Sequence, residues 1–279
     1  MLKLNDKEVT INHFPDGTIL LKGRPQKRIH EFMFMAMNEL GVKITWHYEN
    51  NEELVALIFL VGHLRQNGID EINLYMPYIP NARQDRVKSN EDVFTLKYFA
   101  NIINYLNFKS VHVLDPHSHV SEALIDRVVV HTPKKLIDTV IKGLTDYGAV
   151  KNLTMFYPDE GAMKRYSSMF AVPYAFGIKE RNWEDGKIIG MSVSGMTDKI
   201  RDNRVLIVDD ICSKGGTFYH SAKKLKELGA SEIFLFVTHC ENTVLYGDLI
   251  NSGLIDRIYT TNSIFTKSHE LIEVLNYEN

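Results

Sequence analysis

The sequence predicts an α/β protein whose strands form parallel sheets flanked by helices. Three observations support this fold class. A unit of amphipathic helix, short polar turn and apolar strand recurs along the chain, its strands end in polar residues, and no Pro/Gly/Ser-rich linker or low-complexity segment interrupts the pattern. Helix-then-strand units of this kind imply parallel strands joined by right-handed crossovers.

The recurring unit occurs three times and sets the expected element order. The three copies are a helix at 52–65 with a strand at 72–76, a helix at 96–106 with a strand at 111–114, and a helix at 219–228 with a strand at 233–237.

The chain is long enough for two α/β domains. It has 279 residues, 44% of them hydrophobic, which is ample for a buried core in each domain. A further helix-like segment at 134–144 opens the second half. We therefore expect a boundary between Thr132 and Pro133, with domains at 1–132 and 133–279.

Composition excludes several classes of protein. The 32 basic and 35 acidic residues give a formal net charge of -3, without the basic excess of a dedicated nucleic-acid binder. Cys212 and Cys240 form no CxxC or zinc-like spacing, which fits a reducing cytoplasm. The first seven residues are too polar for a signal peptide, and the longest apolar run, 54–62, is too short to span a bilayer. We expect a soluble cytoplasmic protein with no nucleic-acid or membrane partner.

Polar residues cluster where the predicted strands end. In parallel sheets the ligand site lies at the carboxyl ends of the strands. The polar residues at these ends are Arg83, Gln84, His117, Asp159, Asp209, Asp210 and His239.

The most informative segment is 204–217. Its residues 205–208 are apolar and predict a strand buried on both faces. Asp209 and Asp210 follow, then Ser213-Lys214-Gly215-Gly216-Thr217 and a helix. Glycines at this place let backbone N–H groups approach an anion, while the helix N-terminus and the Thr217 hydroxyl add favourable contacts. The segment predicts a monophosphate cradle but not a Walker A loop, because GxxxxGK[ST] is absent.

The adjacent carboxylates of Asp209 and Asp210 need a partner, since two like charges side by side are costly. Ribose hydroxyls and a hydrated Mg²⁺ would both serve. A solvated loop with an acidic helix cap is the alternative, but the whole arrangement favours phosphoribose binding. The segment resembles the phosphoribosyl-pyrophosphate signature of type I phosphoribosyltransferases and of ribose-phosphate diphosphokinases.

Residues 77–86 distinguish these two families. Their sequence, Pro-Tyr-Ile-Pro-Asn-Ala-Arg-Gln-Asp-Arg, resembles a segment of ribose-phosphate diphosphokinases that the transferases lack. On spacing alone, a charged surface turn is an equally good interpretation. The resemblance implies that Arg83 and Gln84 contact ATP. Arg can donate to phosphate from two nitrogens or stack on a base.

Three shorter segments resemble the same family in the same order. Phe14-Pro15-Asp16-Gly17 resembles its Phe-Ser-Asp-Gly turn, Asp115-Pro116-His117 its Asp-Leu-His motif, and Pro158-Asp159-Glu160-Gly161 its Pro-Asp-x-Gly motif.

These matches carry implied roles. Phe14 and Asp16 are expected to reach the ATP base of a neighbouring subunit, which implies a homodimer or higher homo-oligomer. His117 is expected to assist MgATP binding, and Asp159 to bind metal near the ribose. The implied cofactor is Mg²⁺, with ATP as co-substrate.

Lys179-Glu180-Arg181 resembles the catalytic Lys-x-Arg pair at the foot of a mobile flap in that family. Transfer of a diphosphate spreads negative charge over phosphate oxygens, which cations stabilise. Alternate residues of an extended segment share a face, so both side chains could reach one phosphate. An exposed charged turn is the alternative interpretation.

The resemblance implies two type I phosphoribosyltransferase-like domains, each a parallel sheet flanked by helices. The N-terminal domain would hold ATP, and the C-terminal domain would carry the sugar-phosphate loop and the flap. The implied reaction is in-line transfer of the β,γ-diphosphate of MgATP to the anomeric O1 of a 5-phosphorylated ribose, releasing AMP.

The sequence departs from the family at the acceptor loop, as in a divergent, shortened member. Ser213 stands in place of a usual carboxylate, and Lys214 in place of a usual Thr, which raises the loop charge by two units. Such a loop could accept more phosphate charge. Ribose 5-phosphate is the favoured acceptor and ADP-ribose the alternative.

Two other functions are considered. A phosphoribosyltransferase would explain the Asp209-Asp210 segment but not 77–86 or Lys179 and Arg181. A non-catalytic regulatory partner of a diphosphokinase is expected to show erosion at these motifs, which this chain retains.

Overall fold

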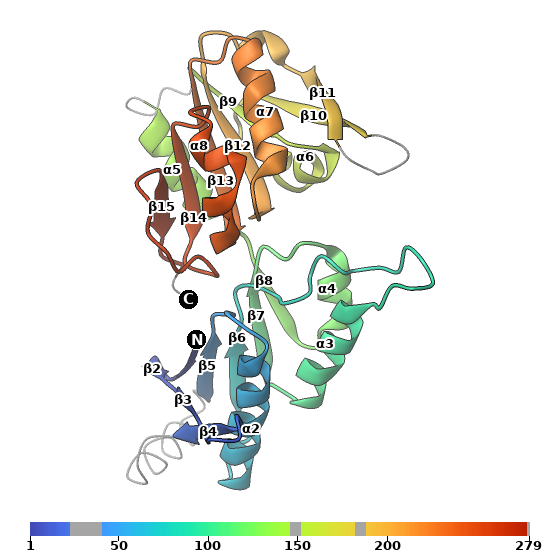
Figure 1. Cartoon of the computed structure of the whole chain (residues 1–279), viewed down its shortest axis with the longest axis vertical. Helices are drawn as coiled ribbons and strands as arrows, with labels where there is room; N and C mark the ends of the chain where they lie inside the picture. Colours follow the sequence, from blue (N-terminus) through green and yellow to red (C-terminus); the bar gives the residue numbers. More distant parts are fainter. Residues whose placement is uncertain (23–40, 146–151, 182–187, 278–279) are drawn as a thin grey trace. The chain divides into compact units, whose positions relative to one another are not determined.

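The computed structural model describes residues 1–22, 41–145, 152–181 and 188–277. The chain divides into two compact units, Met1–Thr132 and Pro133–Asn279 (Figure 1). Each is an α/β unit built on a mainly parallel sheet, which confirms the predicted fold class.

The first unit contains a six-stranded sheet in the order β2-β1-β5-β6-β7-β8. Strands β5 to β8 are parallel, whereas β1 is antiparallel to both β2 and β5. A separate two-stranded hairpin, β3-β4, lies outside the sheet. The strands are β1 (Leu2–Leu4), β2 (Lys7–Glu8), β3 (Thr10–His13), β4 (Ile19–Lys22), β5 (Val42–Trp46), β6 (Ile72–Tyr75), β7 (Ser110–Leu114) and β8 (Val128–His131).

The described helices of this unit are α2 (Glu52–Gln66), α3 (Thr95–Tyr105) and α4 (His119–Leu124). Apolar residues recur along α2 and α3 at helical spacing, and their buried members pack with alternate residues of β5, β6 and β7 in one core. The predicted helices at 52–65 and 96–106 therefore form within one residue of their expected bounds.

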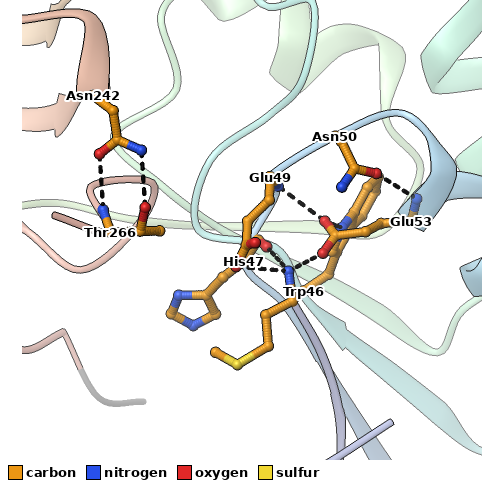
Figure 2. Close-up of polar contacts among 8 residues, drawn as sticks. Trp46, His47, Glu49, Asn50, Glu53, Asn242 and Thr266 are labelled. Atoms are coloured by element: carbon orange, nitrogen blue, oxygen red, sulfur yellow. Dashed lines mark hydrogen bonds and ion pairs between the residues drawn. The ribbon is translucent and has the colours of Figure 1, made fainter. Parts of the chain in front are cut away.

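A buried carboxylate fixes the start of α2. Glu53 is 4% exposed and accepts hydrogen bonds from Trp46 Nε1 at 3.0 Å and from the Glu49 backbone N–H at 2.9 Å. The amino group of Met1 also forms an ion pair with it. Figure 2 shows the Glu53 side chain turned toward these groups, while Asn50 accepts from the Glu53 backbone. The charge is buried with several partners, as a buried charge requires.

We expect Glu53→Ala to lower the free energy of unfolding by about 3 kcal/mol, because it leaves buried donors unpaired. Urea denaturation measures the effect. Glu52→Ala is the matched control: its ion pair with His13 joins side chains that are 41% and 49% exposed, so its loss should cost less than about 1 kcal/mol. Equal losses for both variants would contradict the structural role of Glu53.

The second unit contains a seven-stranded sheet in the order β11-β10-β9-β12-β13-β14-β15. All neighbouring strands are parallel except β10 and β11, which form an antiparallel hairpin at one edge. The strands are β9 (Leu153–Tyr157), β10 (Tyr174–Arg181), β11 (Ile188–Gly195), β12 (Arg204–Cys212), β13 (Glu232–Cys240), β14 (Arg257–Thr261) and β15 (Ile272–Leu275).

Helices cover both faces of this sheet. Buried residues of α5 (Lys134–Leu144) and α6 (Glu160–Tyr166) pack with Leu206 and Val208 on one face. Those of α7 (Gly216–Glu227) and α8 (Asp248–Asn251) pack with Val205 and Ile207 on the other. Successive side chains of β12 thus alternate between two cores, as predicted for a strand buried on both faces.

Short elements complete the second unit. They include the 3₁₀ turns η4 (Thr197–Lys199) and η5 (Asn242–Tyr246). Asn242 is tied by two hydrogen bonds to Thr266, which Figure 2 also shows. Among the described residues, no helix is both long and apolar enough to cross a membrane.

Candidate active site

Three carboxylates lie near the carboxyl ends of two neighbouring strands in the second unit. β12 and β9 are parallel and paired, with Ile207 opposite Phe156. β12 does not end at Val208, as expected, but continues through Asp209 and Asp210 to Cys212, because it stays paired with β13. Asp159 follows β9 as the N-cap of α6. The Asp159 side chain accepts a hydrogen bond from the Ala162 backbone N–H at 3.0 Å, which is the usual arrangement of a helix cap.

The electrostatics of this cluster favour an incoming donor or cation. Burial raises the pKa of Asp209 well above its usual range, and the negative charges of Asp210 and Asp159 raise it further. Such an upward shift marks a carboxylate that lacks sufficient compensation from its surroundings. Ligand hydroxyls or a metal ion would supply that compensation.

Asp210 has a cationic partner that the sequence did not reveal. It is 5% exposed, and its Oδ2 lies 3.6 Å from Nη1 of Arg165 on α6. The contact depends on α6 packing beside β12. An Arg six residues after Asp159 was visible in the sequence, but its direction toward β12 was not.

The loop after β12 is shaped by two glycines. Gly215 has φ +82°, in the left-handed region that glycine tolerates, and a Cβ added to it would lie 2.8 Å from Leu249 Cδ2. A Cβ added to Gly247 would lie 1.8 Å from the Lys214 carbonyl oxygen. A Cβ added to Gly216, by contrast, would meet nothing within 4 Å. Leu249 and Gly247 therefore pack closely against the loop backbone at Gly215 and Lys214. At Gly216 the space next to the backbone is open.

The remaining loop residues surround that opening. Gly216 is the first residue of α7, with Gly215 as its N-cap. Ser213 and Thr217 are half-buried, and Lys214 is exposed. The start of α7 presents unpaired backbone N–H groups and the positive end of the helix dipole. The arrangement can bind a phosphate, and Lys214 adds a cation beside it.

We expect the two glycine substitutions to separate folding from phosphate binding. Gly247→Ala should lower the melting temperature, because its Cβ cannot coexist with the Lys214 backbone. Gly216→Ala should keep or slightly raise it, because Ala is the better helix former and meets no atom there. Gly216→Ala should still weaken binding of ribose 5-phosphate, measured by calorimetry, since its methyl group enters the cradle. Unchanged binding would contradict a phosphate site at α7.

The proposed catalytic pair lies on the hairpin at the sheet edge. The backbone of Lys179 pairs with Met191, and that of Arg181 pairs with Ile188. A β-bulge lies between Glu180 and Arg181, so simple alternation along an extended strand does not describe this backbone. The side chains of Lys179 and Arg181 lie outside the described part of the chain, as do residues 182–187, which follow the pair where the flap is expected.

In the first unit, the turn after β6 approaches the end of β7. Leu114 donates to the Pro77 carbonyl oxygen at 3.0 Å, and Arg83 and Gln84 follow in an exposed turn. Gln84 Oε1 accepts a hydrogen bond from Thr95 Oγ1 at 2.5 Å. This bond orients the Gln84 amide at the start of α3.

Asp85 links that turn to the half-buried His117. Arg86 donates to both carboxylate oxygens of Asp85, at 2.7 and 3.0 Å. These bonds lower the pKa of Asp85, and His117 is close enough to lower it further. The structure therefore brings the 83–86 turn and His117 together, as their positions after adjacent parallel strands predict.

Phe14 and Asp16 lie at the tip of the β3-β4 hairpin. Phe14 is 49% exposed. Asp16 Oδ1 accepts hydrogen bonds from the Thr18 backbone N–H at 3.0 Å and from Thr18 Oγ1 at 2.7 Å. Both bonds lower the pKa of Asp16. The turn thus presents an aromatic ring beside a fixed carboxylate.

His239 has a structural environment. It is 3% exposed, and its Nδ1 lies 2.8 Å from Ser263 Oγ. The Ser263 hydroxyl also contacts the Thr238 carbonyl oxygen. The sequence alone left the role of His239 open.

The carboxylates of the second unit fit a hydrated Mg²⁺ held by one or two oxygens better than a cage made only of protein ligands. In the described ranges, no group of three His, Cys, Asp or Glu side chains is close enough to hold a metal ion. Mg²⁺ usually retains several waters and binds through one or two carboxylates together with substrate phosphates. The high pKa of Asp209 beside Asp159 is consistent with such a site.

Comparisons with known proteins agree with this arrangement. Residues 1–106 match the N-terminal domain of ribose phosphate pyrophosphokinase. A ribose-phosphate pyrophosphokinase of Thermococcus kodakarensis is 26% identical over 93% of this chain and 86% of its own length. Its counterpart in Sulfolobus acidocaldarius is 28% identical over 92% and 85%. The crystal structure of phosphoribosylpyrophosphate synthetase from Mycobacterium smegmatis covers 96% of this chain and 86% of that chain, with a TM-score of 0.74 and 20% identity.

The fold and the sequence matches thus define an enzyme of the diphosphotransferase class. The chain is a divergent relative of the ribose-phosphate diphosphokinases, as its motifs predicted.

Proposed function

We propose that the chain transfers the β,γ-diphosphate of ATP to the anomeric hydroxyl of ribose 5-phosphate and releases AMP. The observation that carries the proposal is the Asp209-Asp210 pair, placed beside Asp159 and followed by the open cradle at Gly216. Curated relatives that align with more than nine tenths of the chain bear the name ribose-phosphate pyrophosphokinase.

The sugar site is proposed to lie between β12 and α7. Asp209 and Asp210 accept hydrogen bonds from the ribose hydroxyls, which relieves the repulsion that raises the pKa of Asp209. The loop from Ser213 to Thr217 holds the 5-phosphate through backbone N–H groups and the α7 dipole. The guanidinium of Arg165, 3.6 Å from Asp210 Oδ2, offsets part of the negative charge at this site.

ATP is proposed to bind residues of the first unit. Arg83 and Gln84 contact the nucleotide, with Gln84 held by Thr95. His117, next to the same turn, assists MgATP binding and is one metal contact. Phe14 and Asp16 are proposed to reach the base from a neighbouring copy of the chain, which makes the active form at least a homodimer.

The metal is proposed to be Mg²⁺, held near the ribose by Asp159. When bound, it neutralises phosphate charge and orients the diphosphate. The site's own carboxylates then hold the sugar hydroxyls in line with the β-phosphorus. Lys179 and Arg181 stabilise the charge on the transferring group.

The bond changes balance without a covalent enzyme intermediate. The sugar O1 forms a bond to the β-phosphorus of ATP, while the bond from that phosphorus to the oxygen bridging to the α-phosphorus breaks. AMP departs with the bridging oxygen, and the hydroxyl proton is released to solvent.

ADP-ribose is the second candidate acceptor. Lys214 is exposed at the cradle, where it can pair with additional phosphate charge. Ser213, which replaces a carboxylate, removes a repulsive charge from the same loop. An acceptor with a second phosphate fits this charge change.

The test is to incubate the chain with ATP, Mg²⁺ and either acceptor, and to measure AMP and the diphosphorylated sugar. We expect both products with ribose 5-phosphate. Activity restricted to ADP-ribose would replace the favoured acceptor. If neither ribose 5-phosphate nor ADP-ribose gives these products, the proposal of diphosphate transfer is wrong. Incubation with phosphoribosyl pyrophosphate and a free base would then test the transferase alternative. Activation of a separate diphosphokinase by the inactive chain would instead support a regulatory partner.

A further inference from the structure

A cavity of about 690 Å³ lies in the second unit between β11 and α7. Its walls are the strand segment from Gly190 to Val193, η4 and the part of α7 from His220 onward. No residue proposed above for the sugar, ATP or metal lines it. Its size lies within the range of about 300–1,000 Å³ that is typical of small-molecule sites.

The α7 wall of the cavity carries two lysines, a histidine and one acidic residue, Glu227. His220, Lys223 and Lys224 lie at positions i, i+3 and i+4 and therefore share one helix face. Lys224 Nζ is paired with Glu227 at 3.1 Å. The Lys223 side chain makes no hydrogen bond or ion pair with any residue that the structure describes. Its charge is thus available to a ligand.

The opposite wall supplies an apolar floor. Met191 and Val193 of β11 line the cavity, with Thr197 beside them. Met191 also contacts α7, because its Sδ lies 3.7 Å from Ser221 Oγ. A cavity with cations on one side and apolar atoms on the other suits a ligand with an anionic end and an apolar body.

We propose that this cavity binds an organic phosphate, a small molecule whose phosphoryl group contacts Lys223 and His220 and whose body packs on Met191 and Val193. A phosphate suits the Lys223 and His220 donors better than a carboxylate does, since a phosphate offers three acceptor oxygens. The volume exceeds that of inorganic phosphate alone and leaves room for the attached body.

A ligand in this cavity can influence the proposed catalytic hairpin, because β11 forms one wall of the cavity. Met191 pairs directly with Lys179 across β10 and β11. A ligand held between β11 and α7 restrains the strand that positions Lys179. This regulatory consequence rests on the proposed function, whereas the binding site itself does not.

The experiment measures binding of phenyl phosphate by calorimetry in the absence of ATP and Mg²⁺. We expect saturable binding to the full chain, weaker binding of inorganic phosphate and none of phenol. Lys223→Ala and His220→Ala should each weaken binding of phenyl phosphate at least about ten-fold. Lys226→Ala is the matched control: it removes the same charge from α7 at a residue outside the cavity, whose Nζ donates to the Ser231 carbonyl oxygen.

Two further measurements distinguish binding in this cavity from binding in the sugar-phosphate cradle. Gly216→Ala, which fills the sugar-phosphate cradle, should leave phenyl phosphate binding intact. Amide hydrogen exchange at Met191 and Ser192 should slow when phenyl phosphate is bound.

The proposal is overturned if phenyl phosphate does not bind, or if Lys223→Ala, shown by its melting curve to be folded, binds as tightly as the parent. Loss of binding in Gly216→Ala but not in Lys223→Ala would assign the phosphate to the cradle instead. The binding measurements use no ATP. They therefore test the cavity even if the chain does not catalyse diphosphate transfer.

Discussion

Asp209→Asn is expected to unfold at a higher temperature than the parent chain in metal-free buffer, while diphosphate transfer is lost. The surroundings of Asp209 oppose its charge through burial and through Asp210 and Asp159. The amide is similar in shape and carries no charge, so it removes this penalty. For a chain of this size each kcal/mol regained raises the melting temperature by about 2–4 °C.

The sign of the pH dependence follows from the raised pKa. The folded state of the parent holds the Asp209 proton more tightly than the unfolded state does. Stability contributed by this group therefore falls as pH rises above the ordinary carboxyl pKa of about 4, until the folded pKa is passed. The advantage of Asp209→Asn should vanish near pH 4 and grow as the pH rises above it, because the folded pKa of Asp209 is raised.

Asp210→Asn is the matched comparison, because it removes the same charge one residue away. It also gives up the ion pair with Arg165, so its melting temperature should lie below that of Asp209→Asn. Thermal melts in EDTA across this pH range measure both. A melting temperature of Asp209→Asn at or below that of the parent near pH 8 would contradict the electrostatic penalty that we assign to the charged Asp209 side chain.

A substitution that raises stability and abolishes activity is expected at a functional site, where a residue needed for ligand binding lowers the stability of the folded state. Asp209 lies in the last part of β12, directly after Val205 to Val208, which are all buried. The apolar residues of the strand supply the stability. Asp209 accepts one hydrogen bond, from the Asp210 backbone N–H, and this bond does not offset the effects that raise its pKa.

Much of the fold could be predicted because its signals are local. The helix pattern at 96–106 and the apolar run at 205–208 each contain their own periodicity. The boundaries of α7 were less visible: it begins at Gly216, three residues before the predicted start, because Gly215 in the left-handed region replaces a side-chain N-cap. The expectation of parallel strands fails at the edges, where β1, β2 and β11 are antiparallel.

The site was harder to predict where it depends on packing between distant segments. Asp209 and Asp210 were identified from one continuous segment. The ion pair of Asp210 with Arg165 requires α6 to lie beside β12, and the closeness of Gly247 to Lys214 requires the turn after η5 to pack on the loop. Neither contact leaves a periodic or motif-like trace in the sequence.

Lys179→Ala and Arg181→Ala are expected to lower kcat for diphosphate transfer by about 10²- to 10³-fold each, the usual loss when one preorganised donor to a developing charge is removed. The KM for ribose 5-phosphate should change only a few-fold, because the sugar site lies on β12 and α7. Lys199→Ala is the matched control, since it removes an exposed lysine of the same unit that is paired only with Asp198 among the described side chains.

The double variant distinguishes a shared target from two separate ones. If Lys179 and Arg181 act on the same phosphate, removing both should cost less than the product of the single losses. The bulge between Glu180 and Arg181 makes this a sharp question, because the two residues pair with Met191 and Ile188 rather than with strictly alternating partners. Rapid-quench measurement of AMP formation gives the chemical step directly. Single variants that keep the parent rate, or that melt well below it, would show that the pair supports the hairpin rather than the reaction.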